Sequence, residues 1–210
     1  MEDEVKKGVF VKTIRTTLLL SLSILWIAGC SPKAMEEKAE VLEAEDGADK
    51  NAEALQAVIE KEFSGPDEEY RKLLDAAMMA QNDVTNQEEF DALMETPVYQ
   101  DYITYMEDTY AKYFTENGLE NFLNSTPAFM YSVFDGDYKL APSDIEITQN
   151  DQEPTLYHFT FNVNWTGEEA ETASFSFDGR AMVPKEGKIG TIQFGDMDGL
   201  RTKLSEAGVN

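Results

Sequence analysis

The stretch LYHFTFNVNWTGEEAETASFSFDGRAMV, residues 156–183, decides the fold of this chain. Apolar and polar side chains alternate along both of its halves, Leu156–Trp165 and Glu171–Val183. Since successive side chains of a strand point to opposite faces of a sheet, the alternation predicts two antiparallel strands with one covered and one polar face. The covered face would carry Tyr157, Phe159, Phe161, Val163, Trp165, Ala173, Phe175 and Phe177. The polar face would carry His158, Thr160, Asn162, Asn164, Thr172, Ser174, Ser176 and Asp178.

Three further segments around this pair have the composition of strands. They are Phe129–Phe134, Asp144–Thr148 and Lys188–Phe194. Turn sequences separate the strands at Asp135-Gly136, Thr166-Gly167 and Glu186-Gly187. We therefore expect an antiparallel meander. Leu200 and Leu204, which follow the last strand, predict a short C-terminal helix because they recur at helical spacing.

The sequence before the strands is helical in pattern. A stripe of Leu55, Val58, Ile59 and Phe63 predicts a first helix that ends at Ser64-Gly65-Pro66. Pro66 should open a second helix, because the dipole favours the acidic residues that follow it. The buried stripe of this second helix would be Tyr70, Leu73, Leu74, Ala77 and Met78.

Two capping signals mark the next helices. Thr85 and Glu88 have the spacing of a capping box and predict a short helix through Phe90, Leu93 and Met94. Thr96-Pro97 predicts the start of a long aromatic helix that runs to about Thr115 and ends at Asn117-Gly118. A short helical segment, Leu119–Leu123, would follow.

Helices first and antiparallel strands second make an α+β fold. The segments EKEFSGPDEEY (60–70), YFTENGLENFLNSTPAF (113–129) and GKIGTIQFGDMDGL (187–200) resemble those of NTF2-like, or cystatin-like, domains in secreted lipoproteins of Firmicutes. The resemblance implies a cone-shaped domain in which a curved sheet wraps around the N-terminal helices. It does not imply one function, because similar domains include enzymes, subunits of transport machinery and modules with no assigned task.

The first thirty residues have the organisation of a secretory signal. Basic residues precede the apolar run LLLSLSILWIAG at 18–29, which spans about 18 Å as a helix and is too short for an ordinary transmembrane span. Ile27-Ala28-Gly29-Cys30 at its end resembles a bacterial lipobox. The resemblance implies cleavage after residue 29 and attachment of lipid to Cys30, including an acyl chain such as palmitate. We therefore expect a protein anchored to the extracytoplasmic face of the cell membrane.

Composition divides the remainder of the chain and excludes several functions. Residues 30–50 are rich in Ala, Glu and Lys and predict a solvated tether, which leaves residues 51–208 as the folded domain. The 210 residues include 17 Lys and Arg, 41 Asp and Glu, one Cys and one His, with a net charge of −24. A general nucleic-acid binder needs a basic face, which this chain cannot assemble. One cysteine excludes a disulfide framework and a thiolate zinc cluster.

Few residue patterns suggest chemistry, and we expect neither a cofactor nor a metal. His158 could share the polar sheet face with Ser174, Ser176 and Asp178, but strand serines lack the exposed turn of a nucleophile. Asp135-x-Asp137 and Asp196-x-Asp198-Gly199 do not fit the EF-hand loop and are better interpreted as turn aspartates. Tyr102, Tyr110 and Tyr113 on the aromatic helix are candidate lining residues of a pocket, although their spacing is equally typical of a core stripe.

These observations predict a non-catalytic binding or assembly module of the cell envelope. Its partner would be another envelope protein or a small ligand, besides the membrane that holds the lipid. The alternative is an isomerase or dehydratase that uses a pocket inside the cone, with a carboxylate as base and a tyrosine as donor. The sequence presents no carboxylate with an evident buried position. A buried carboxylate beside a tyrosine would favour the enzyme, and an apolar interior would favour the module.

Overall fold

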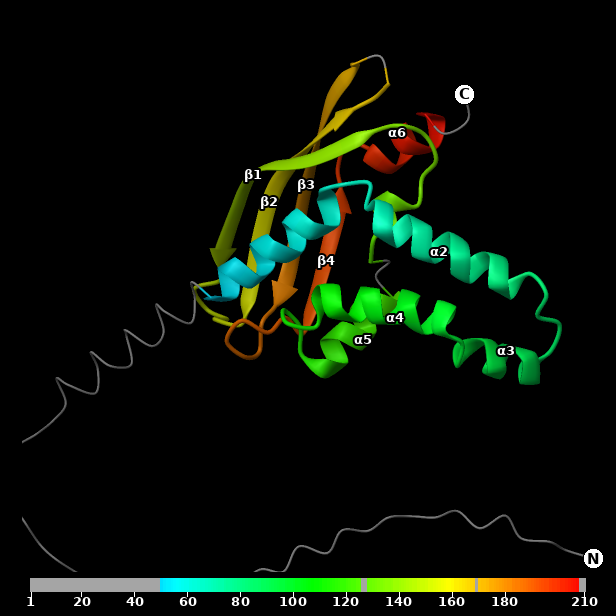
Figure 1. The fold of residues 1–210 in the computed structure, drawn as a ribbon. Helices are drawn as coiled ribbons and strands as arrows, with labels where there is room; N and C mark the ends of the chain where they lie inside the picture. Colours follow the sequence, from blue (N-terminus) through cyan, green and yellow to red (C-terminus); the bar gives the residue numbers. More distant parts are fainter. Residues whose placement is uncertain (1–49, 126–127, 169, 208–210) are drawn as a thin grey trace, which may run out of the picture.

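The computed structural model describes residues 50–125, 128–168 and 170–207. It confirms the α+β class, because helices precede an antiparallel sheet and one helix follows it (Figure 1). The first helix covers residues 50–63 of the described chain. The other elements are α2 (Glu68–Gln81), α3 (Gln87–Met94), α4 (Pro97–Tyr110), α5 (Glu116–Ser125), a 3₁₀ turn (Met130–Ser132), β1 (Lys139–Gln149), β2 (Leu156–Thr166), β3 (Thr172–Met182), β4 (Thr191–Asp196) and α6 (Leu200–Ala207).

The sheet has the order β1-β2-β3-β4, and each neighbouring pair is antiparallel. The alternation in residues 156–183 sets its register as predicted, with Phe161 opposite Phe177 and Asn162 opposite Ser176. β1 is an edge strand, and its register with β2 shifts between Ser143 and Glu146. Asp144, inside this shift, has a left-handed backbone with φ of 53°. The edge strand is therefore bent at its centre.

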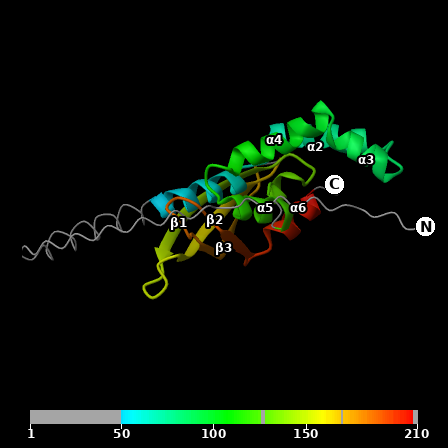
Figure 2. The ribbon, with the colours of Figure 1, turned by 90° about the horizontal axis from the view of Figure 1, so that it is seen from below.

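The helices cover the apolar face of the sheet, as the sequence predicted. Phe63 at the end of the first helix is fully buried, and its ring lies 4.7 Å from Phe161 and 4.8 Å from Phe177. The first helix and α4 lie on the same side of the sheet (Figure 2). The opposite face carries the predicted polar side chains, from His158 to Asp178, of which all but the half-buried Asn162 are exposed.

Two expectations about the strands are wrong, and the strand expected at Lys188–Phe194 is displaced, since β4 begins at Thr191 and ends at Asp196. Residues 129–134 do not form a strand: they contain a 3₁₀ turn that Phe129 enters with φ of 59°. Buried and exposed residues do not alternate along this segment, as they would along a strand with one covered face. The strand expected at Asp144–Thr148 is longer and begins at Lys139, because the bend at Asp144 hides the pattern on either side of it.

The helix boundaries differ from the predicted ones by one to a few residues. Asp67, not Pro66, precedes α2, and its carboxylate accepts the Tyr70 N–H. The N-cap of α3 is Asn86, one residue after the predicted Thr85, and Glu89 takes the role expected of Glu88 by accepting from the Thr85 N–H. Met78, expected in the buried stripe of α2, is 55% exposed.

The long aromatic helix is divided into two. α4 starts at Thr96-Pro97 as predicted but ends at Tyr110, and Asn117-Gly118 lie inside α5. Gly118 is needed there for packing, because a Cβ at this position would lie 2.5 Å from the Ile189 carbonyl oxygen. Together, α2, α3 and the start of α4 project beyond the sheet (Figure 1). Among the described residues, no helix has both the length and the apolarity needed to cross a membrane.

Candidate functional site

Two adjoining cavities of about 470 Å³ each open between α2, the β2–β3 hairpin and α6. They share the lining residues Gly136, Asp137, Tyr138, Gly167 and Glu168, so we treat them as one groove. Pro66, Glu68, Arg71, Lys139, Thr166 and Ala170 complete the first cavity, and Trp165, Glu171, Lys203, Glu206 and Ala207 complete the second. We call the whole surface the terminal groove.

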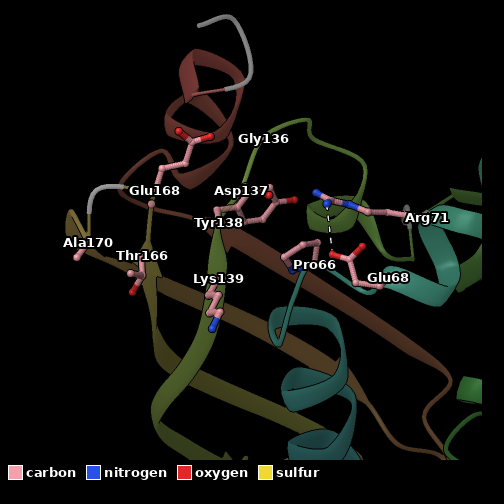
Figure 3. A pocket seen from close by; sticks show the side chains of 11 residues that line it. Pro66, Glu68, Arg71, Gly136, Asp137, Tyr138, Lys139, Thr166, Glu168 and Ala170 are labelled. Carbon is pink, nitrogen blue, oxygen red and sulfur yellow. Dashed lines mark hydrogen bonds and ion pairs between the residues drawn. The ribbon is translucent and has the colours of Figure 1, made fainter.

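The wall from α2 is held by Arg71. Its guanidinium donates to the backbone carbonyls of Ser132 and Phe134, pairs with Glu68 at 3.5 Å, and lies 5.2 Å from the centre of the Tyr138 ring. The Tyr138 hydroxyl in turn donates to the Tyr131 carbonyl. Figure 3 shows this wall opposite the hairpin that carries Glu168 and Ala170. Because Arg71 is engaged by the protein, it fixes the shape of the groove.

The floor of the second cavity contains Trp165. The residue is 3% exposed, and the Lys203 ammonium lies 4.4 Å from its ring centre. Its indole Nε1 is buried and has no hydrogen-bond acceptor among the described residues. Buried N–H donors are almost always paired, because an unpaired one loses its hydration without compensation. Trp165 therefore lines the terminal groove and keeps, just beneath its surface, a donor that no described residue uses.

Carboxylates dominate the rim of the groove. Glu68 pairs with Arg71, and Glu171 lies 3.7 Å from Lys203. The other three acids, Asp137, Glu168 and Glu206, are exposed and have no ion-pair or hydrogen-bond partner in the described part of the chain. The lining therefore carries five carboxylates against three cations, Arg71, Lys139 and Lys203, and this excess of acids gives the open groove a negative field.

A second polar centre lies inside the core. Glu62 is 4% exposed, and its carboxylate accepts from the Tyr110 hydroxyl at 2.7 Å and from the N–H groups of Phe129 and Met130 at 2.9 and 3.0 Å. Burial raises the pKa of Glu62 to about 7, against the opposing effect of these three donors. The carboxylate holds the left-handed backbone of Phe129 against the first helix and α4. It does not line the terminal groove.

A polar network lies beside Glu62, nearer the surface. The Lys61 ammonium pairs with Asp67 at 2.6 Å, and the Tyr105 hydroxyl donates to both oxygens of Asp67 at 3.0 Å. Partial burial acts to raise the pKa of Asp67, but Lys61, the Tyr70 N–H and Tyr105 together hold it below its ordinary value. Asp67 therefore stays ionised and fixes the start of α2.

The three tyrosines proposed from the sequence are separated by the fold. Tyr110 is fully buried on Glu62, and desolvation raises the pKa of its hydroxyl well above the ordinary value. Tyr102 is half-buried with its ring 5.9 Å from Tyr70, and Tyr113 is half-buried under Lys112. None of the three lines the terminal groove, nor the smaller cavity of about 300 Å³ between α4 and α5.

The polar sheet face does not gather a triad. His158 lies opposite Arg180, whereas Ser176 and Ser174 lie opposite Asn162 and Asn164. These registers place the serines about 13 and 20 Å along the sheet from His158, since a strand rises about 3.3 Å per residue. Among the described residues, no group of three His, Cys, Asp or Glu side chains could hold a metal ion.

The sequence predicted turn aspartates in both aspartate motifs, and the structure confirms this for Asp196. Asp196 accepts from the N–H groups of Gly199, Leu200 and Arg201 and so caps α6. Asp198 accepts from the Ser176 N–H. Asp135 is exposed, and Asp137 belongs to the terminal groove.

The lipobox residues Ile27, Ala28, Gly29 and Cys30 lie outside the described residues. Lys50, which we assigned to the tether, is already helical and pairs with Glu186. Comparison with models of protein families, with curated proteins and with solved structures found no match.

Sequence reasoning missed both polar centres, for different reasons. Glu62 has a signal that could have found it, since it stands four residues after Val58 and three after Ile59, within the apolar stripe. The terminal groove has none, because its walls come from four segments that only the topology brings together.

Proposed function

We propose that this chain is an extracytoplasmic lipoprotein, anchored through Cys30, that acts as a non-catalytic binding or assembly module of the cell envelope. Its folded part would be an NTF2-like domain, and the terminal groove would be its binding site for an envelope protein or a small ligand. The observation that carries this proposal is the indole N–H of Trp165, which has no acceptor among the described residues. An acceptor on a bound ligand would supply the missing hydrogen bond. The α+β order and the covered sheet face are consistent with the NTF2-like assignment.

The chemistry of the groove supports binding more than catalysis. Its described lining contains no His, Cys or Ser, and two of its three cations, Arg71 and Lys203, are engaged by neighbouring aromatic rings and carboxylates. Groups of this kind orient a ligand through charge and hydrogen bonds but supply no nucleophile poised beside a base.

Site-specific photo-crosslinking in intact cells tests this proposal. A photoreactive benzoylphenylalanine at Lys139, an exposed lining residue, should form an adduct that the same group at Thr160, on the opposite sheet face, does not form. Asp137→Trp, which fills the shared wall of both cavities, should abolish the adduct. Adducts that are the same from both positions, or unchanged by Asp137→Trp, would contradict a binding role for the groove.

One observation favours the alternative of an isomerase or dehydratase. Glu62 and Tyr110 are a carboxylate with a pKa near neutrality and a hydroxyl 2.7 Å from it, the pair that such chemistry uses. The carboxylate is nevertheless enclosed, and three protein donors occupy its oxygens. A folded Glu62→Gln protein that keeps the groove adduct but fails to complement a deletion strain would favour the enzyme.

A further inference from the structure

We propose that the terminal groove binds an extended, basic polypeptide segment of a partner protein, with a backbone carbonyl accepting from the Trp165 indole and a Lys or Arg side chain among the rim carboxylates. This inference rests on the proposed binding function and specifies the chemistry of the ligand. It follows from two independent observations, one on hydrogen bonding and one on charge.

The first observation identifies an acceptor as one part of the ligand. Trp165 is buried, lines the second cavity, and leaves its only donor unpaired among the described residues. Since Nε1 is itself enclosed, the ring must shift toward the groove to meet an acceptor there. Indole has no acceptor atom, so the group that satisfies it must offer a lone pair. A peptide carbonyl is such a group and carries no charge that the acidic rim would repel.

The second observation identifies a cation as the other part. Asp137 and Glu168 line both cavities, and Glu206 extends the acidic rim toward α6. These three carboxylates have no partner among the described residues, two of the three lining cations, Arg71 and Lys203, are already engaged, and Lys139 alone offsets only one of the three charges. An anionic ligand would meet this rim with net repulsion, and a cationic side chain would complement it.

The shape of the groove favours a polypeptide over a compact ligand. Its two cavities are joined along five shared residues and extend from α2 to α6. A peptide of several residues can place one backbone carbonyl at Trp165 while the side chain of another residue reaches the acidic rim. Since every residue of the peptide has a backbone carbonyl, several registers of the peptide can supply the acceptor. Free arginine offers only a carboxylate as its acceptor, which the rim disfavours.

The test follows the indole N–H directly by NMR. The full chain contains two tryptophans, Trp26 and Trp165, so ¹⁵N-labelled protein with Trp26→Phe gives a single indole signal from the groove. The probes are acetyl-Gly-Gly-Arg-Gly-Gly-amide, the same peptide with uncharged citrulline in place of arginine, and free arginine. We expect the arginine peptide to move the indole proton downfield to saturation, and the citrulline peptide to bind about tenfold more weakly.

Variants separate the two contacts. Trp165→Phe, which removes the donor, should weaken the arginine peptide about five- to tenfold by calorimetry. Glu168→Gln and Glu206→Gln should each weaken it about threefold, and Glu120→Gln, which removes the same charge at the α4–α5 cavity, should not. The Trp165→Phe protein must keep the circular dichroism spectrum of the parent chain.

The outcomes distinguish this inference from the function on which it rests. Equal affinity for the arginine and citrulline peptides would overturn the basic ligand while leaving the groove a binding site. If free arginine binds as tightly as the arginine peptide, the inference that the ligand is a polypeptide is wrong. An indole signal that no probe moves would overturn the inference, and the crosslinking at Lys139 would then decide the binding function separately.

Discussion

Glu62 connects three parts of the chain that are far apart in the sequence. It receives the Tyr110 hydroxyl from α4 and two backbone N–H groups from residues 129 and 130, while its own backbone belongs to the first helix. The Phe129 ring, held by this arrangement, stacks on Tyr70 at 4.2 Å. A single carboxylate therefore fixes how the loop before the sheet meets the helices.

Stability should depend on pH through Glu62. Burial raises its pKa from 4.5 to about 7, so the folded protein binds this proton more tightly than the unfolded chain does. The resulting stabilisation is complete below about pH 4.5 and is lost as the pH rises through 7. It amounts to at most about 3 kcal/mol, since each pKa unit corresponds to about 1.4 kcal/mol.

Denaturant unfolding at several pH values measures this contribution. The stability of the wild type minus that of Glu62→Gln should fall between pH 5 and pH 8. Glu60→Gln, the same substitution at an exposed position of the same helix, should give a difference that is flat over this range. Parallel curves for the wild type and Glu62→Gln would show that Glu62 does not titrate there.

At the scale of elements, the register of β2 can be tested by two adjacent residues. Phe161 is 2% exposed among the rings of Phe63 and Phe177, whereas Thr160 is exposed on the polar face. Phe161→Ala should cost about 3–5 kcal/mol of unfolding free energy, and Thr160→Ala less than about 1 kcal/mol. Chemical denaturation of the two variants compares them, and equal losses would contradict the register.

The cap of α6 gives a second test at this scale. Asp196 accepts from three N–H groups at the start of the helix, and Leu200 and Leu204 on that helix are fully buried. Asp196→Ala should therefore lower the unfolding free energy by about 1–2 kcal/mol. Asp135→Ala, at an exposed turn, is the matched control and should have little effect in the same thermal melts. If both variants lose a similar unfolding free energy, the effect comes from the change in net charge and not from the cap of α6.

The sequence predicts a helix or a strand correctly where the periodic spacing of apolar residues is the dominant signal. Alternation in residues 156–183 and the stripe from Leu55 to Phe63 both mark buried faces correctly, because each depends on the period of one element. Residues 129–134 were misassigned since their burial depends on Glu62, 67 residues earlier in the chain. The groove and its free indole arise from tertiary arrangement, for which no local pattern exists.

At the scale of the whole molecule, the proposed attachment to the membrane would rest on one thiol. Cys30 is the only cysteine of the chain, so a substitution there cannot be compensated by another. Cys30→Ser should transfer the protein from the membrane fraction to the medium, or leave an uncleaved precursor. Fractionation with immunoblotting measures the distribution, and mass spectrometry of the wild type identifies the modified residue. An unmodified Cys30 in a cleaved chain would contradict lipid anchoring.

The bend in β1 has a consequence for molecules that meet at high density. An open edge strand invites backbone pairing with a neighbouring copy and growth into fibres. Here Pro142 lacks an N–H to offer, the shift around Asp144 turns the edge out of line, and the exposed Glu146 adds a charge just beyond it. Two such β1 edges cannot align over more than a few residues, so this edge of the sheet is protected against pairing between crowded copies.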